Sequence, residues 1–257
     1  MLLLLFGFGC LTGVTTVLFG FGGGFLTVPA VFAFVRASAG ADAMHVAVAT
    51  STAVMVVNSL TATVAQARAG RLRREYVWPL IAFVAAGALL GSLVAIGVAD
   101  VVLHVAFIGY VVITIVDSLV RRGFVDLRET RAPLGRGTVT AGGVGIGAVA
   151  SALGVGGSVL TVPLLRRAGL PMAEAAAIAN PLSAPVAVVG TLVYAFAASG
   201  PTGYVDVPAG AALLCGSLPA IAITRRVVGR IPDRVHAIAY LGLLIAVTIA
   251  MVLTLVV

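Results

Sequence analysis

Two ten-residue stretches of the chain share one unusual pattern of residue types. Residues 20–29 read GFGGGFLTVP and residues 154–163 read GVGGSVLTVP, at a constant offset of 134 with seven of ten positions identical. Glycine permits unusual backbone angles and is a poor helix former, whereas proline is accepted in the first turn of a helix. We therefore expect Pro29 and Pro163 to begin half-helices of about 9–11 residues, with Thr27 and Thr161 near their caps.

Helix N-termini of this kind have chemistry of their own. Each carries unpaired N–H groups and roughly half a positive charge, which together bind anions without any Lys or Arg. Backbone that is not helical is tolerated at membrane depth only inside protein or beside a wet cavity. The duplication favours an anion site between two facing helix ends, and tight helix packing is the alternative explanation for the glycines.

Polar residues in the segments after each glycine stretch complete the candidate site. An Asn within an apolar segment is costly unless it is hydrogen-bonded, so Asn58 and Asn180 are either contacts between helices or ligand contacts. For the Ser and Thr residues, contacts between helices are the default interpretation. The candidate substrate-binding residues are Gly22, Gly23, Gly24, Thr27, Thr50, Ser51, Asn58, Gly156, Gly157, Ser158, Thr161, Asn180 and Ser183.

The ionisable residues indicate little further chemistry. The sequence has no deep pair of acidic residues of the kind that marks proton pumps, so only His45 and Glu174 are candidates for proton coupling. It contains no HExxH motif and no Ser–His pairing, and Cys10 and Cys215 lack metal-ligand spacing. We expect no enzyme activity, no metal site and no cofactor.

The elements that position these residues follow from composition. The 257 residues are 61% hydrophobic and 10% charged, whereas a soluble domain has about 25% charged residues. At about 20 residues per span, this length predicts a polytopic, all-α membrane protein with no sizeable soluble domain. Apolar segments are expected at 1–36 (interrupted at 20–24), 43–67, 76–98, 101–120, 137–168 (broken near 154–157), 172–198, 207–224 and 235–257.

The duplication divides the chain into a first membrane repeat at 1–120, a cytoplasmic linker at 121–136 and a second membrane repeat at 137–257. All 16 basic residues are Arg, and 15 of them lie in the connections 68–75, 121–136, 166–171 and 225–234. If each interrupted segment is a re-entrant hairpin followed by three crossings, the second repeat is inverted and all four connections share one side. The positive-inside rule then makes these connections cytoplasmic and places both termini outside. If every segment crosses, only Arg166 and Arg167 are misplaced.

The glycine elements, followed by His45 to Ser51 (HVAVATS), resemble the sulfite exporter TauE/SafE family of membrane permeases over nearly the whole chain. The second half departs from this pattern, with Ala179-Asn180-Pro181 in place of Ala49-Thr50-Ser51. The resemblance implies transport of small sulfur-containing anions, such as sulfite or sulfonates, across the bacterial inner membrane.

Inverted repeats favour a secondary transporter that works by alternating access, and an anion channel with the same central site is the alternative. The expected partners are a small anionic substrate and the lipid bilayer, not nucleic acid, and a homodimer is left open.

Overall fold

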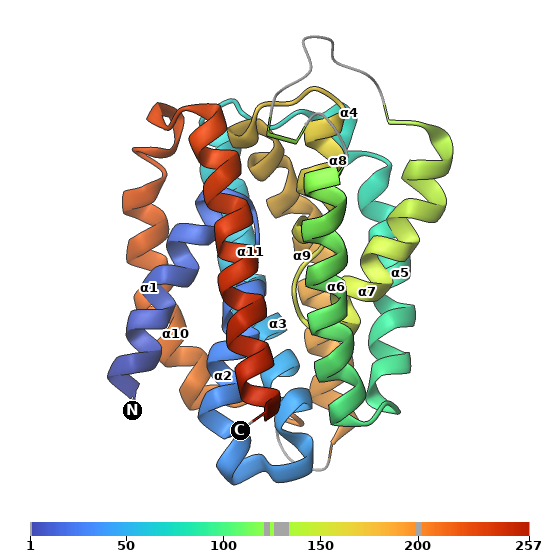
Figure 1. The fold of residues 1–257 in the computed structure, drawn as a ribbon, viewed down its shortest axis with the longest axis vertical. Coiled ribbons are helices and arrows are strands. Elements are labelled where there is room, and N and C mark those ends of the chain that lie inside the picture. Colours follow the sequence, from blue (N-terminus) through green and yellow to red (C-terminus); the bar gives the residue numbers. More distant parts are fainter. Residues whose placement is uncertain (1, 121–123, 126–133, 199–201, 257) are drawn as a thin grey trace.

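The computed structural model describes residues 2–120, 124–125, 134–198 and 202–256, and these residues are almost entirely helical (Figure 1). The first half contains α1 (Leu2–Phe19), α2 (Gly24–Ala39), η1 (Gly40–Asp42), α3 (Ala43–Arg68), α4 (Arg74–Val77), α5 (Leu80–Ile96) and α6 (Asp100–Val120). The second half contains η2 (Thr138–Gly142), α7 (Gly143–Leu153), α8 (Ser158–Arg167), α9 (Met172–Ala197), α10 (Val207–Thr224), η3 (Val228–Arg230) and α11 (Asp233–Val256).

The prediction of a polytopic helical membrane protein is confirmed. Within the described residues, seven helical stretches are long and apolar enough to cross a membrane, and two shorter apolar helices accompany them. Large apolar side chains such as Val105, Ile113 and Leu119 of α6 are exposed on the outside of the fold, where a soluble protein would place polar ones. These faces suit contact with lipid.

Both interrupted segments are broken where the glycines occur. Residues 20–23 separate α1 from α2, and residues 154–157 separate α7 from α8. In Figure 1, α2 lies toward the end of the molecule that carries both termini, whereas α8 lies toward the opposite end. Most of the predicted linker, 121–136, falls outside the described residues.

The prediction that the two prolines begin these helices is wrong. α2 begins at Gly24 and α8 at Ser158, so each proline lies in its helix interior, five residues after the start. A proline there leaves the carbonyl four residues earlier without its usual N–H donor. In α8 the Tyr240 hydroxyl donates to that carbonyl, Val159 O, at 2.9 Å. The 10-residue α8 has the expected length, but α2 has 16 residues.

Helix pairing in the fold crosses between the two halves. α1 packs along α10, and α7 packs along α5, so the first helix of each half lies against a later helix of the other half. α3 contacts α9 in the middle of the molecule, and α6 contacts α11. The glycines Gly9, Gly13 and Gly147 make these contacts close, because a Cβ at any of them would collide with a carbonyl of the neighbouring helix.

Candidate functional site

The two glycine loops contain the unusual backbone angles expected of their composition. Gly20, Gly22 and Gly23 have φ values of 73°, 60° and 95°, and Gly154 and Gly156 have values of 66° and 70°. L-residues with a side chain rarely adopt this left-handed region, so both loops need glycine at these positions. The loops are not identical, since Gly157 has an ordinary φ of −69° whereas its counterpart Gly23 does not.

The two loops lie against each other. A Cβ on Gly24 would sit 2.5 Å from the carbonyl oxygen of Gly154, and a Cβ on Gly156 would sit 3.1 Å from that of Phe21. The Ser51 hydroxyl bridges the loops, 3.0 Å from Gly24 O and 2.8 Å from Gly154 O. The glycines therefore allow two segments 134 residues apart to meet backbone to backbone in the middle of the fold.

The contact places the start of α2 against the loop that leads into α8. Neither helix has a side-chain cap that hydrogen-bonds its first N–H groups. A helix begun in this way keeps unpaired N–H groups and the positive end of its dipole at the loop. Because the two helices run toward opposite ends of the molecule (Figure 1), both positive ends lie at the junction of the loops.

Hydroxyl groups near these helix ends differ between the halves. Thr27 donates a hydrogen bond of 2.9 Å to Gly23 O and so closes the first turn of α2. Within the described residues, the hydroxyls of Ser158 and Thr161, at the matching place in α8, are buried with no hydrogen-bond partner. Two donors are therefore unused beside the second helix end.

The two candidate asparagines also differ. Asn58 Oδ1 accepts a hydrogen bond of 2.7 Å from the Ser217 hydroxyl, while its buried Nδ2 has no partner among the described residues. That Nδ2 lies against the first loop, 2.7 Å from where a Cβ of Gly23 would be. In Asn180 the donor is used and the acceptor is free. Its Nδ2 donates to Thr16 O and Ala176 O, both at 3.2 Å, and its Oδ1 has no partner within the described part of the chain. Of these two described amide side chains, Asn58 is therefore the one with a free donor, which is what an anion requires.

The remaining hydroxyl candidates make structural contacts. Thr50 Oγ1 accepts a hydrogen bond of 2.9 Å from the backbone N–H of Asp206, away from the loops. Ser183 donates to Ala179 O at 3.0 Å, and its Oγ lies 3.0 Å from where a Cβ of Gly156 would be. All thirteen candidate substrate-binding residues are buried, so the junction of the loops is closed from both ends in this conformation.

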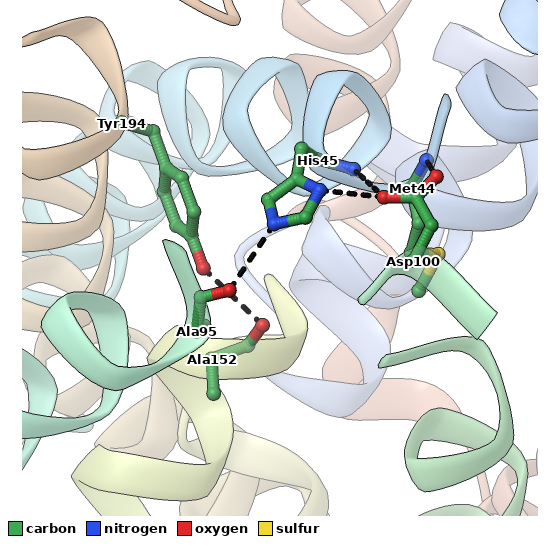
Figure 2. A network of polar contacts seen from close by, with 6 residues as sticks. All are labelled: Met44, His45, Ala95, Asp100, Ala152 and Tyr194. Carbon is green, nitrogen blue, oxygen red and sulfur yellow. Dashed lines mark hydrogen bonds and ion pairs between the residues drawn. The ribbon is translucent and has the colours of Figure 1, made fainter. Parts of the chain in front are cut away.

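Neither candidate for proton coupling touches the glycine loops. His45 is buried at the start of α3 and contacts the Asp100 carboxylate, as Figure 2 shows. Glu174 lies near the start of α9, partly exposed, with its carboxylate 3.4 Å from Arg73 Nε. Among the described residues, no group of three or more His, Cys, Asp or Glu side chains is placed to hold a metal ion.

Sequence reasoning missed several residues that line the loops. The Met55 thioether lies between them, with Sδ 2.8 Å and 3.1 Å from where Cβ atoms of Gly156 and Gly24 would be. Thr12 on α1 reaches Gly23, and its buried hydroxyl also has no partner within the described residues. Met55 follows Ser51 by four positions, so one helix face holds both, but an apolar residue in an apolar segment gave no signal of this position.

Pockets lie at both ends of the molecule. One of about 320 Å³ is lined by residues of the α3–α5 region, including Gly70, Arg74 and Trp78, and reaches Pro181 in the interior of α9. Another, of about 260 Å³, is lined by Val46, Tyr204 and Asp206 at the end that carries the termini. Pro181 adjoins Asn180, so the first pocket leads toward a candidate residue.

Comparison with known proteins gives one match. A family model described as Sulfite exporter TauE/SafE matches residues 5–251. No curated protein and no solved structure matches the chain.

Proposed function

Because this chain belongs to the sulfite exporter TauE/SafE family, a family of membrane transporters and not of enzymes, we propose that it carries small sulfur oxyanions across the membrane. Sulfite and organosulfonates are the proposed substrates. The proposed binding site is the junction of the two glycine loops, where the N-terminal ends of α2 and α8 meet.

The observation that carries this proposal is the free amide of Asn58. A buried donor without a partner costs free energy, and such groups in native proteins call for an explanation. Its position against Gly23, at the positive end of α2, fits hydrogen bonding to an oxyanion. The unpartnered hydroxyls of Ser158 and Thr161 supply donors on the side of α8.

Alternating access is the proposed mechanism. α2 and α8 extend from the junction toward opposite ends of the molecule (Figure 1), and pockets lie at both ends while the junction itself is buried. This is the arrangement expected of a closed intermediate, in which a bound anion is separated from water on both sides. Movement of one predicted inverted repeat against the other then exposes the anion to either side in turn.

The experiment measures counterflow of labelled sulfite in liposomes that contain the purified protein. Asn58→Leu removes the free donor, and a lost hydrogen bond to a charged group is worth about 1.5–3 kcal/mol, or roughly tenfold or more in apparent affinity. We expect KM to rise by that factor. Thr61→Val, on the same helix but partly exposed, is the matched control and is expected to keep the KM of the unmodified protein.

Two results would contradict the proposal. An unchanged KM in Asn58→Leu would remove Asn58 from the site. Single-channel currents in place of counterflow would identify a channel instead of a carrier.

A further inference from the structure

In each half, an aspartate carboxylate accepts hydrogen bonds from the N-terminus of the central helix, α3 or α9. The carboxylate of Asp100, at the start of α6, accepts hydrogen bonds from the backbone N–H groups of Met44 at 2.6 Å and His45 at 3.2 Å. In the other half, the Asp233 carboxylate, at the start of α11, accepts from Met172 N at 2.7 Å. Each aspartate therefore ties the last helix of its half to the N-terminus of α3 or α9, at opposite ends of the molecule.

A basic side chain faces each aspartate, but the two basic groups differ chemically. Arg166 Nη1 lies 2.8 Å from Asp233 Oδ2, and the fully buried guanidinium also donates to the carbonyls of Phe124 and Leu170. Arginine stays protonated at every pH that a folded protein experiences. The partner of Asp100 is His45, whose Nδ1 lies 2.5 Å from Asp100 Oδ1, and histidine gains and loses its charge near neutral pH.

The contacts of His45 define how many protons the pair holds. Figure 2 shows its Nδ1 directed at the Asp100 carboxylate and its Nε2 directed at the carbonyl of Ala95, 3.1 Å away. A carbonyl oxygen only accepts, so Nε2 must carry a proton. The 2.5 Å contact with Asp100 requires a second proton between Nδ1 and the carboxylate. With one proton fewer, either Nδ1 would direct a lone pair at the Asp100 carboxylate or Nε2 would direct one at the Ala95 carbonyl, so one of the two contacts would become repulsive.

The surroundings allow this proton to reach water. Asp100 lines a pocket of about 280 Å³ together with Arg36 and His104, at the end of the molecule that carries the termini. Tyr204, from the connection between α9 and α10, stacks on the His45 ring with centroids 5.2 Å apart. Burial and the carboxylates of Asp42 and Asp100 raise the pKa of Tyr204, so its phenol stays neutral. The charged and titratable groups around the pair are thus Arg36 and His104 in the pocket, Tyr204 on the ring and, beside Tyr204, Asp42 and Asp206.

We propose that His45 and Asp100 form the proton-binding site of this transporter. The proton that they share holds α3 against α6 and keeps the end near the termini closed. When the pair gives this proton to water in the adjoining pocket, neutral His45 and ionised Asp100 remain, the ring can donate to only one of Asp100 and Ala95, and that end opens. Arg166 makes the corresponding contact at the other end independent of protons. This inference rests on the proposed function and adds to it a coupling ion that acts at one end only.

The first test measures opening without any substrate. In a chain with Cys10 and Cys215 changed to Ala, Val46→Cys places a thiol beside the second pocket, and Ala41→Cys gives an exposed reference thiol on η1. We expect the maleimide labelling rate at position 46, divided by that at position 41, to rise with pH. His45→Arg copies the permanent charge of Arg166 and is expected to keep this ratio low at every pH. A ratio that responds to pH equally with His45 and with Arg at this position would overturn the proposal.

The second test separates coupling from transport. Liposomes with the unmodified protein are expected to accumulate labelled sulfite when a pH gradient is imposed. With His45→Gln, the amount of accumulated sulfite is expected to be roughly tenfold lower. The same variant is expected to retain counterflow at equal pH within about twofold. His236→Gln, which keeps a donor for the Leu18 carbonyl and lies outside the pocket beside Asp100, is the control and is expected to accumulate normally.

The outcomes of the second test distinguish the two proposals. Absence of counterflow in the unmodified protein would contradict the proposed function. Normal counterflow with equal accumulation by the unmodified protein and His45→Gln would contradict the proton site alone.

Discussion

The residues of the candidate site are of two kinds: glycines that set the backbone of the loops, and polar side chains with hydrogen-bond donors for a ligand. Positive φ values at Gly22, Gly23 and Gly156 make glycine a requirement of the backbone. The free donor of Asn58 and the free hydroxyl of Ser158 make no structural contact that would explain them. The chemistry available to an anion therefore comes from a few donors placed beside helix ends, with no buried positive side chain among the candidates.

The two glycines at the starts of α2 and α8 are expected to tolerate substitution differently. In Gly23→Ala the alanine would have to adopt a φ near 95°, and its Cβ would lie 2.7 Å from both Asn58 Nδ2 and Thr12 Cγ2. In Gly157→Ala the φ of −69° is ordinary, and the nearest atom, Ile146 Cγ2, is 3.3 Å away. Backbone strain of this kind costs about 1–3 kcal/mol, so we expect Gly23→Ala to lose most sulfite counterflow and Gly157→Ala to retain it. Equal losses in the two variants would contradict the asymmetry of the loops.

At the scale of elements, the hairpins depend on partners outside themselves. Pro163 lies inside α8 and deprives Val159 O of its usual donor, and the Tyr240 hydroxyl of α11 replaces it. α11 thus stabilises the half-helix of its own repeat. The short α8 is held by this bond and by the buried Arg166, because ten residues of helix are marginal in isolation.

Helix packing between the halves predicts a sharp difference between two glycines of α7. A Cβ at Gly147 would collide with the carbonyl of Val84 on α5, whereas a Cβ at Gly145 has nothing within 4 Å. Overpacking of this kind costs about 1–3 kcal/mol. We expect Gly147→Ala to lower the melting temperature of the purified protein in detergent. Gly145→Ala, the matched control, is expected to melt at or above the original temperature, because alanine favours the helix.

At the scale of the whole molecule, α1 pairs with α10 and α7 pairs with α5, so each half packs against the other along two helix pairs. Both chain termini lie at one end, whereas α4 and the last turn of α8, with Arg166 and Arg167, lie at the other (Figure 1). The inverted repeat and the side of the membrane that each end faces stay predictions. So do the division at 121–136, the inner membrane as the location and the homodimer.

Reporter fusions test the orientation. Because 15 of 16 Arg lie in the four connections, a reporter active only outside the cytoplasm is expected to be active after Val257 and inactive when inserted into 225–234. A cytoplasmic signal after Val257 would reverse the predicted orientation. Activity at both positions would place 225–234 and the C-terminus on the same side.

The sequence by itself determined the class of protein, the family and the positions of the helices. Apolar segments such as 43–67 and 172–198 match α3 and α9 closely, because a span needs a continuous apolar run that composition reveals directly. The breaks between helices at both glycine stretches could also be predicted from the sequence, since glycine runs are poor helix formers. At Pro163 the predicted helix start is wrong because a hydroxyl from a distant helix, that of Tyr240, compensates for the missing hydrogen bond.

Only the tertiary structure decided which polar groups are satisfied. Asn58 and Asn180 are equivalent by residue type and setting, but one has a free donor and the other a free acceptor, because their neighbours come from other helices. The Asp100 partner of His45 lies 55 residues away, and the Asp233 partner of Arg166 lies on α11, so neither pair could be read from local spacing. Local patterns fix helices, but hydrogen bonding and charge pairing depend on contacts across the fold.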